Sequence, residues 1–205
     1  MEKKLLQTLV IGAIAGAFIA LLTIDVTNVY DKKDENSLIA QYYEIENSVS
    51  VSPHGLRGKM SKGQTEDYIL VDLRSQEEYE KEHVVTAVNI PAYKDANTSA
   101  YDEETRIVDS FKELIEANPD KEIITYCYST ACMTSRKIGL LLAENDIYVK
   151  HLNIGWNEWR YAWDMWNHDS ETPTKVEDYV VSGTEPGIPP KTDAIPSCTE
   201  GELGC

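Results

Sequence analysis

The sequence has little positive charge: 19 lysine and arginine residues stand against 35 aspartate and glutamate residues. The formal net charge of −16 would repel a phosphate backbone, which argues against nucleic-acid binding. The same acidity weakens attraction to anionic lipid, so membrane attachment would require a hydrophobic segment.

Cysteine is also scarce, with four residues in a chain of 205. Cys127 and Cys132 lie in mid-chain, and Cys198 and Cys205 lie at the C-terminus. Four cysteines are too few for a disulfide-stapled scaffold, and neither pair has the C-x-x-C spacing of a zinc ribbon. The C-terminal pair fits either a small disulfide loop or a carrier of thiol equivalents to the active site.

One long hydrophobic run is present, over residues 5–24, and it contains no charged residue. Its length suits a single membrane-spanning helix. Lys3 and Lys4 precede the run and favour a cytoplasmic N-terminus, which would place the remaining chain outside the cytoplasmic membrane. The alternative is a cleaved signal peptide and a secreted domain, although the residues after Ile24 form a poor cleavage site.

Small residues recur at four-residue spacing within this run, at Gly12 and Gly16. Such a face allows two membrane helices to approach closely, which favours a homodimer through the anchor. Glycine is also simply common in membrane helices, so this spacing alone leaves the oligomeric state open.

Composition divides the chain into four parts. Residues 1–24 form the anchor, residues 25–49 a polar linker with a short helix, and residues 50–167 the folded domain. Residues 168–205 are rich in proline and lack apolar periodicity, which predicts an extended or disordered tail.

Apolar runs in the domain alternate with helical patterns. Strands are expected at 68–72, 87–90, 122–126 and 147–152. Helices are expected from Ser52-Pro53, after Ser75, and over 102–117, 133–144 and 157–167, with a polar loop at 92–100. This alternation predicts an α/β fold with a mostly parallel sheet.

Cys127 ends the predicted strand 122–126 and precedes a short loop and a helix. Ligands bind at the carboxyl ends of strands in such sheets, and the loop amides and helix N-terminus both stabilise a thiolate. Because a thiolate is the nucleophilic form, this position favours a reactive cysteine. A buried cysteine at a strand end is otherwise an inert small hydrophobic residue.

Several motifs, taken in order, resemble those of the rhodanese domain, over roughly residues 50–166. Residues 70–79 (LVDLRSQEEY) resemble its D-x-R…E-Y motif, and residues 82–91 (EHVVTAVNIP) resemble its G-H-I-x-G-A-x-N-I-P stretch. Cys127 falls at the position of the catalytic cysteine, and residues 152–156 (LNIGW) resemble the closing strand and glycine turn. The resemblance implies a three-layer rhodanese-like fold.

The resemblance also implies a sulfurtransferase that uses no metal or organic cofactor. Cys127 would take sulfane sulfur from a small donor as a persulfide and pass it to a thiol acceptor. The substrate-binding loop would comprise Tyr128, Ser129, Thr130, Ala131 and Met133.

The chain departs from the family pattern at three positions. Cys132 stands where many members have arginine, which should weaken the binding of oxyanions such as thiosulfate. Glu82 and Thr86 replace two usual glycines, which puts the local turn geometry in question.

Cys132 opens an alternative reaction. A second thiol in the loop can attack a Cys127 persulfide or a mixed disulfide, which would make the protein a thiol–disulfide or persulfide reductase. Cys132 is otherwise a small filler of the loop. A third reading is a non-enzymatic module that binds a partner or senses sulfane sulfur.

Three polar residues near these motifs are expected to support the structure rather than the chemistry. Asp72 should accept backbone N–H bonds, Arg74 should pair with a carboxylate, and His83 should form structural hydrogen bonds. The four histidines show no metal-ligand spacing, so no metal site is expected.

Overall fold

The computed structural model describes residues 34–167 and 174–191. The chain divides into two compact units, Met1–Ile45 and Glu46–Cys205. The predicted anchor and the glycine pair within it lie outside the described residues. Within the described ranges, no helix has the length and apolar character that a membrane span requires.

Helix α2 (Glu35–Val49) occupies the predicted linker. Asp34 caps its start, because its carboxylate accepts the backbone N–H of Ser37 at 2.8 Å. None of its side chains is buried. The short helix expected in this region is therefore present.

A five-stranded parallel sheet forms the centre of the second unit, with strand order β1-β8-β7-β2-β4. Its strands are, in chain order, β1 (Ser50–Val51), β2 (Tyr68–Asp72), β4 (Ala87–Asn89), β7 (Glu122–Tyr126) and β8 (Lys150–Leu152). The prediction of an α/β fold with a mostly parallel sheet is confirmed.

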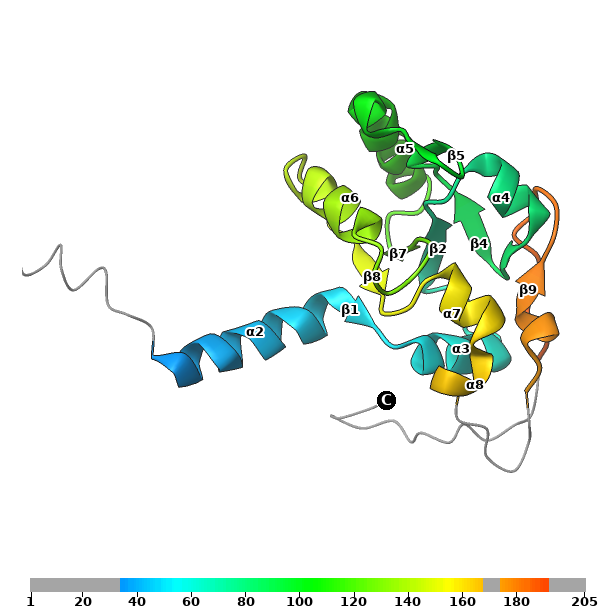
Figure 1. The fold of residues 1–205 in the computed structure, drawn as a ribbon, viewed down its shortest axis with the longest axis horizontal. Coiled ribbons are helices and arrows are strands. Elements are labelled where there is room, and N and C mark those ends of the chain that lie inside the picture. The colour runs from blue at the N-terminus through cyan, green and yellow to red at the C-terminus, as the bar shows by residue number, and fades with distance from the viewer. Residues whose placement is uncertain (1–33, 168–173, 192–205) are drawn as a thin grey trace, which may run out of the picture. The chain divides into compact units, whose positions relative to one another are not determined.

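Helices cover both faces of this sheet (Figure 1). One face packs against α3 (Pro53–Ser61), α7 (Trp156–Tyr161) and α8 (Trp163–Trp166), and the other against α5 (Glu104–Glu116) and α6 (Thr134–Ala143). The strands make this possible because neighbouring side chains point to opposite faces: Leu70 belongs to the first core and Val71 to the second.

Local sequence explains where α3 begins. The Ser52 side chain accepts the backbone N–H of Gly55 at 3.3 Å, and Pro53 occupies the first turn, where its missing N–H costs no hydrogen bond. Leu56 and Met60 then lie on one face and are fully buried. The helix start expected at Ser52-Pro53 is therefore confirmed.

Three expected elements differ from the structure. Residues 92–100 are not a plain loop, because β5 (Tyr93–Asp95) and β6 (Thr98–Ser99) form an antiparallel hairpin there. The last strand begins at Lys150 rather than at residue 147. The helix expected over 157–167 is two helices, because Ala162 adopts φ −129° and interrupts the helical backbone between α7 and α8.

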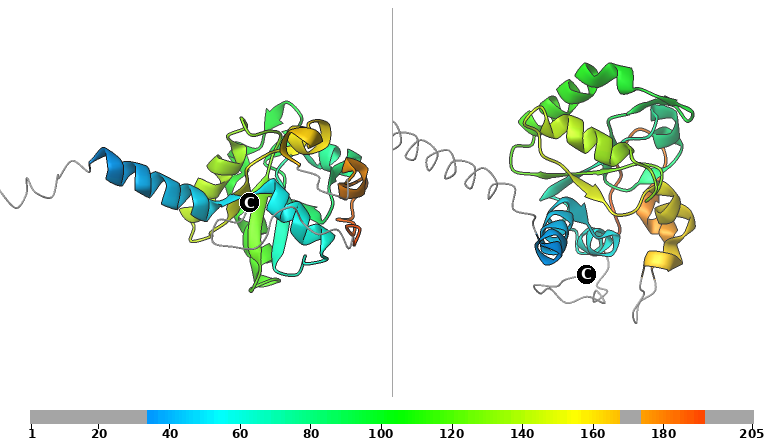
Figure 2. Two further views of the ribbon diagram at one scale, coloured as in Figure 1. Left: turned by 90° about the horizontal axis from the view of Figure 1, so that it is seen from below. Right: turned by 60° about the vertical axis from the view of Figure 1, so that its left-hand side comes forward.

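The expected tail is partly folded. A 3-10 helix, η2 (Val176–Tyr179), leads into β9 (Val180–Val181), which pairs antiparallel with β3 (His83–Val84). Figure 2 shows this segment against the α7–α8 side of the domain. Tyr179 holds it there, with a hydroxyl 2.6 Å from Ser61 Oγ and a ring stacked on Trp163.

The prediction of an extended or disordered tail from residue 168 is thus wrong for residues 176–181, which form η2 and β9. A single buried tyrosine and a two-residue strand carry too little periodicity to be recognised in the sequence. Residues 168–173 and 192–205, with Cys198 and Cys205, lie outside the described residues.

Thr86 carries the backbone strain expected where a glycine is replaced. Its φ is +74°, in the left-handed region that disfavours β-branched residues. Its backbone N–H donates to the carbonyl of Pro186 at 2.5 Å, so the folded tail segment helps to hold this conformation. The turn keeps the glycine-like geometry despite the substitution.

Candidate active site

Strand β7 carries Cys127 to the carboxyl edge of the sheet, where its side chain is 2% exposed. The following turn is fixed by two backbone hydrogen bonds. The N–H of Trp156 donates to the Cys127 carbonyl, and the N–H of Asn157 donates to the Tyr128 carbonyl, each at 2.8 Å. The start of α7 therefore holds the cysteine loop by its backbone.

Glu158 of α7 holds the outer part of the same loop. Its carboxylate accepts the backbone N–H of Thr130 at 3.2 Å and that of Gly155 at 3.0 Å. The N–H of Cys132 donates to the Ser129 carbonyl at 2.9 Å. These loop amides are thus engaged within the protein, so they form a less open anion-binding nest than the sequence predicts.

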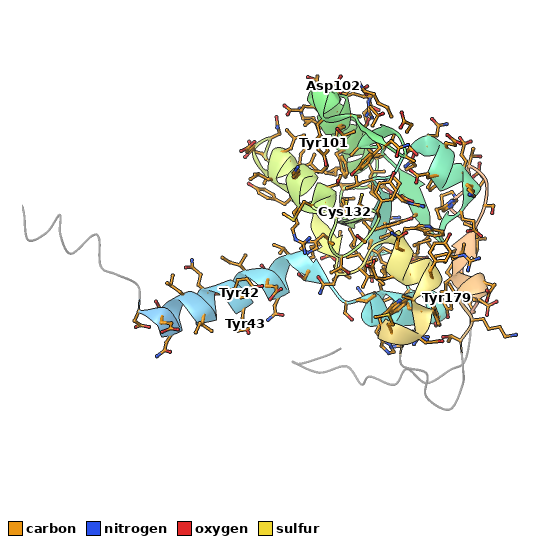
Figure 3. The ribbon with its side chains drawn as sticks, viewed as in Figure 1. Tyr42, Tyr43, Tyr101, Asp102, Cys132 and Tyr179 are labelled. Atoms are coloured by element: carbon orange, nitrogen blue, oxygen red, sulfur yellow. The ribbon has the colours of Figure 1, made fainter. Side chains whose placement is uncertain are left out.

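The two loop cysteines lie against each other, with Cys132 Sγ 3.2 Å from Cys127 Sγ. Cys127 is buried, whereas Cys132 is partly exposed. Figure 3 marks Cys132 in the loop before α6. The distance allows a hydrogen bond between the thiols and requires only a small movement for a disulfide.

Two hydroxyl groups contact the Cys132 sulfur, and a third contacts one of them. Thr134 Oγ1 lies 3.3 Å from Cys132 Sγ, and the hydroxyl of Tyr93 lies 3.9 Å from it. Thr134 Oγ1 also contacts the hydroxyls of Tyr93 at 2.9 Å and Tyr101 at 2.7 Å. The hairpin β5–β6 and the 3-10 helix η1 (Tyr101–Glu103) supply these tyrosines.

These surroundings shift the pKa values of the two thiols in opposite directions. Burial raises the pKa of Cys127, and so do the hydrogen bond that its thiol donates to an ionised Cys132 and the negative charge of that neighbour. Burial also opposes ionisation of Cys132, but hydrogen bonds from the side chain and backbone of Thr134 outweigh it and lower the pKa of Cys132. Cys132 is therefore the sulfur that loses its proton first.

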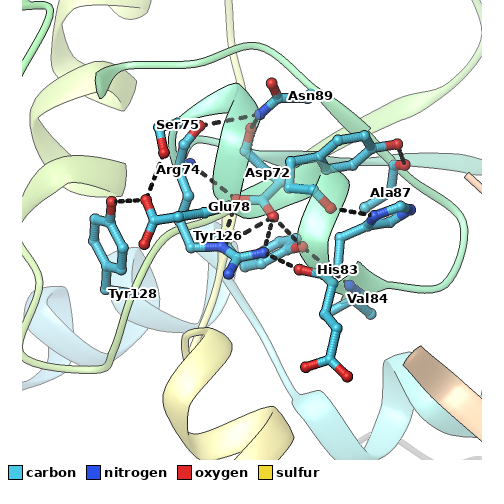
Figure 4. Close-up of polar contacts among 12 residues, drawn as sticks. Asp72, Arg74, Ser75, Glu78, His83, Val84, Ala87, Asn89, Tyr126 and Tyr128 are labelled. Carbon is cyan, nitrogen blue, oxygen red and sulfur yellow. Dashed lines mark hydrogen bonds and ion pairs between the residues drawn. The ribbon is translucent and has the colours of Figure 1, made fainter. Parts of the chain in front are cut away.

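Tyrosine rings and a carboxylate form the rim beside the thiols. The ring of Tyr128 meets that of Tyr93 edge to face at 5.0 Å. Its hydroxyl donates to Glu78, and the Ser75 hydroxyl donates to the same carboxylate oxygen at 2.6 Å (Figure 4). Burial and the neighbouring Glu78 carboxylate raise the pKa of Tyr128, so it stays protonated.

Ser75 thus precedes α4 (Gln76–Lys81) without capping it through its side chain. The Ser75 hydroxyl donates to Glu78 instead, and Glu78 links α4 to the cysteine loop through Tyr128.

The cations nearest in sequence contact the outer part of the loop and the ring of Tyr101, and neither contacts a cysteine sulfur within the described residues. Arg136 is exposed and donates to the Thr130 carbonyl at 3.3 Å, and the Lys137 ammonium lies 5.2 Å from the centre of the Tyr101 ring. The arginine that would bind an oxyanion in the loop is replaced by Cys132, and neither residue takes its place. The rim is therefore aromatic and acidic rather than cationic.

The remaining loop residues line the outside. Ser129 is half-buried, and Thr130, Ala131 and Met133 are exposed.

Asp72 and Arg74 form a buried ion pair behind the loop, with Arg74 Nη2 2.6 Å from Asp72 Oδ2. Asp72 also accepts the backbone N–H of Arg74 at 2.9 Å and the hydroxyl of Tyr126 at 2.6 Å. The guanidinium stacks 4.3 Å from the centre of the Trp156 ring. These contacts join β2 to β7 and, through Trp156, to α7.

His83 is buried between two carbonyl oxygens. Its Nδ1 lies 2.8 Å from the Tyr79 oxygen and its Nε2 lies 3.1 Å from the Glu185 oxygen. Its ring stacks on Tyr79 with centroids 3.7 Å apart. His83 therefore joins α4 to the folded tail segment.

Sequence reasoning missed Tyr93, Tyr101, Thr134, Glu78 and Glu158 as parts of the site. Thr134 follows Cys132 by two residues, so the sequence alone could have predicted that it lies near the Cys132 sulfur. The others come from distant segments, and only the fold brings them to the loop. Within residues 34–167 and 174–191, no group of three histidine, cysteine or acidic residues is arranged to hold a metal ion.

Comparison with known proteins agrees with this architecture. The family model of the rhodanese-like domain matches residues 52–162, which is more than half of the chain. The protein belongs to the rhodanese-like domain family, for which sulfurtransferase-type activity is the usual activity.

Individual relatives are more distant. A Bacillus halodurans protein of solved structure is 29% identical, covers 62% of this chain and 82% of its own, and has a TM-score of 0.48. An Escherichia coli rhodanese solved with anions is 22% identical over 57% of this chain and 99% of its own, with a TM-score of 0.32.

A curated HTH-type transcriptional regulator of Mycobacterium tuberculosis is 30% identical over 93 residues, which is 45% of this chain. The match spans about a third (34%) of that regulator's length.

Proposed function

We propose that the domain transfers sulfane sulfur through a persulfide on Cys127, with the thiol of Cys132 beside it. The observation that carries this proposal is the 3.2 Å separation of the two sulfur atoms at the carboxyl end of β7. Cys127 would attack the outer sulfur of a donor, and a thiol acceptor would remove that sulfur in a second displacement.

The surroundings of the thiols disfavour thiosulfate, a small dianion, as the donor. A thiosulfate dianion would meet the carboxylates of Glu78 and Glu158 around the loop, and position 132 carries a cysteine and not an arginine. The aromatic rim of Tyr93 and Tyr128 suits a persulfide or polysulfide with an apolar part. We therefore expect organic persulfides and polysulfides to react faster than thiosulfate.

The same sulfur–sulfur contact favours a second candidate, a dithiol reductase. In that reaction Cys132 attacks the Cys127 persulfide before an external acceptor does, releases hydrosulfide and leaves a Cys127–Cys132 disulfide. The two candidates share the first step and differ in the fate of the persulfide.

Mass spectrometry of the full chain, kept in mild detergent because residues 5–24 are apolar, tests these functions. The reduced protein is treated with glutathione persulfide or with thiosulfate, and the gain of sulfur at each cysteine is followed. Persulfide on Cys127 that glutathione removes supports transfer, whereas a Cys127–Cys132 disulfide with released sulfide supports reduction.

Two variants make the result specific. Cys127→Ser should abolish both products, and Cys198→Ser/Cys205→Ser, which leaves the loop pair intact, should preserve them. Failure of every donor to modify Cys127 in the folded protein would leave a binding module as the remaining interpretation.

A further inference from the structure

The Thr134 hydroxyl has three hydrogen-bond partners, which is the most that one hydroxyl can serve. Its Oγ1 lies 2.7 Å from the Tyr101 hydroxyl, 2.9 Å from the Tyr93 hydroxyl and 3.3 Å from Cys132 Sγ. A threonine hydroxyl donates one hydrogen bond and accepts two. Three partners therefore use its full capacity.

The direction of these hydrogen bonds depends on the charge of Cys132. Within the described residues, the Tyr101 hydroxyl contacts Thr134 alone, and either oxygen of this pair can be the donor. The Tyr93 hydroxyl can likewise donate to Thr134. A Cys132 thiol donates to Thr134 Oγ1, whereas a Cys132 thiolate accepts the Thr134 proton while both tyrosines donate to Thr134.

The start of α6 acts in the same direction. Thr134 is the first residue of this ten-residue helix, and Cys132 lies two residues before it. The positive end of the helix dipole and the Thr134 backbone N–H both stabilise negative charge at that point. Cys127, in contrast, is buried in the core formed with α5 and α6.

We propose that Thr134 is a catalytic residue that holds the single negative charge of the reduced pair on Cys132, with Tyr101 as a positioning residue that orients its hydroxyl. The proposal rests on the sulfur-transfer function above and adds the order of proton transfer. Cys132 is first the base for Cys127 and then the resolving nucleophile.

A persulfide donor R–S–SH would react with the pair in three steps. Cys127 attacks the outer sulfur while its proton passes to the Cys132 thiolate, the S–S bond of the donor breaks, and R–S⁻ leaves. Cys132 returns the proton to R–S⁻, giving R–SH, and is again a thiolate. When Cys132 then attacks Cys127 Sγ, HS⁻ leaves and the pair becomes a disulfide.

In the net reaction, R–S–SH, the Cys127 thiol and the Cys132 thiolate give R–SH, HS⁻ and one disulfide. The sulfane sulfur is reduced and the pair is oxidised. A dithiol reductant must then restore the pair. When a thiol acceptor takes the sulfur before the last step, the pair stays reduced and the reaction is simple transfer.

The pH dependence of thiolate formation tests this charge placement without any sulfur donor. The full-length Cys127→Ser variant, with Cys198 and Cys205 also changed to serine, leaves Cys132 as the one thiol. Its ionisation is followed by ultraviolet thiolate absorbance and by the rate of alkylation with iodoacetamide, with the label located by mass spectrometry.

In that background, Thr134→Val should raise the midpoint by about one pH unit, since a hydrogen bond to a charged group has about that effect. Thr134→Ser keeps the hydroxyl and should restore the low midpoint. Tyr101→Phe should shift it by less, and Tyr148→Phe, at an exposed tyrosine away from the site, should not.

A midpoint that is the same in Thr134→Val, Thr134→Ser and the parent protein overturns the proposal. Tyr101→Phe removes only one oxygen atom, so it keeps the test decisive if Thr134→Val fails to fold. Failure of the sulfur-transfer function gives a different result. In that case the midpoint of Cys132 ionisation still responds to changes at Thr134, but no donor forms a persulfide on Cys127.

Discussion

Gly155 lies so close to the backbone of Ser129 that an added Cβ atom would stand 2.2 Å from the Ser129 nitrogen. This contact joins the turn before α7 to the cysteine loop. The backbone of Gly155 is extended, with φ −110°, so the requirement for glycine comes from space and not from an unusual conformation.

Gly155→Ala should therefore displace the loop that carries Cys127. Because a shift of about 1 Å in a reacting group costs roughly a hundredfold in rate, persulfide formation should fall by about that factor. The rate is measured by mass spectrometry with an excess of glutathione persulfide.

Gly139→Ala is the matched control. Gly139 lies within α6, and its new Cβ would meet only the side chain of Val149, at 3.9 Å. It should keep the rate and stabilise the helix by about 0.5–1 kcal/mol. An unchanged rate in Gly155→Ala would contradict the tight contact.

Tyr179 should determine the stability of the domain although it lies in a proline-rich segment. Its side chain is 1% exposed, and Tyr179→Ala removes a buried aromatic ring and the hydroxyl contact to Ser61. The free energy of unfolding should fall by about 3–5 kcal/mol. Tyr179→Phe loses only the hydrogen bond and should cost about 1 kcal/mol.

Urea denaturation followed by tryptophan fluorescence measures both changes, because Trp163 stacks on the Tyr179 ring. Tyr148→Ala, at a tyrosine that is 76% exposed, should alter stability by less than about 0.5 kcal/mol. Equal effects at the two tyrosines would argue that the segment is not bound to the domain.

The sequence predicted the centre of the fold better than its edges. Strands β2 and β7 are continuous apolar runs that are buried on both faces, so residues 68–72 and 122–126 were recovered without error. Strands β1 and β9 have two residues each and exist only through pairing with distant segments. Their sequences hold no periodicity from which to predict them.

The site, too, was predicted only in part from the sequence. Cys127 and Cys132 were recognisable as a pair because one short loop carries both. The hydroxyl cluster around Thr134 was not, since Tyr93 lies in a hairpin that was predicted to be a polar loop and Tyr101 lies in η1, just after it. Contacts between segments that are far apart in sequence require the fold.

Replacing Thr86 by glycine should stabilise the domain. Its φ of +74° costs a β-branched residue about 1–2 kcal/mol, part of which the greater freedom of an unfolded glycine offsets. Thr86→Gly should therefore raise the free energy of unfolding by about 1 kcal/mol. Thermal or urea unfolding checks this, and Thr86→Ala, which keeps a Cβ, should not reproduce the gain.

His83 predicts that the domain loses stability in mild acid. Burial lowers its pKa, and the carbonyl oxygens of Tyr79 and Glu185 oppose this only in part. The unfolded chain then binds a proton more readily than the folded one below about pH 6.5, so stability present above that pH falls as the pH decreases. The slope for one such group is at most about 1.4 kcal/mol per pH unit.

Urea midpoints between neutral pH and about pH 5.5 test this linkage. His83→Gln should reduce the slope, and a part should remain because burial and Arg136 also lower the pKa of His151. Stability that increases toward acid pH in the parent protein, and not in His83→Gln, would show that the pKa of His83 is raised.

The charge at position 132 should set the choice of sulfur donor. In Cys132→Arg a guanidinium would replace a thiolate beside Cys127, where it can pair with a sulfonate oxygen and also favour the Cys127 thiolate. Thiosulfate should then form the Cys127 persulfide at least about tenfold faster than in the parent protein. The resolving step should disappear, since the second sulfur is gone.

Cys132→Gln separates charge from size in this comparison. It removes the thiolate and fills similar space without a positive charge, so it should gain little with thiosulfate while losing the disulfide product. Rates with thiosulfate and with glutathione persulfide are compared as a ratio, which cancels differences in the fraction of active protein. A ratio that is equal in both variants would mean that the rim formed by Glu78 and Tyr128, and not residue 132, selects the donor.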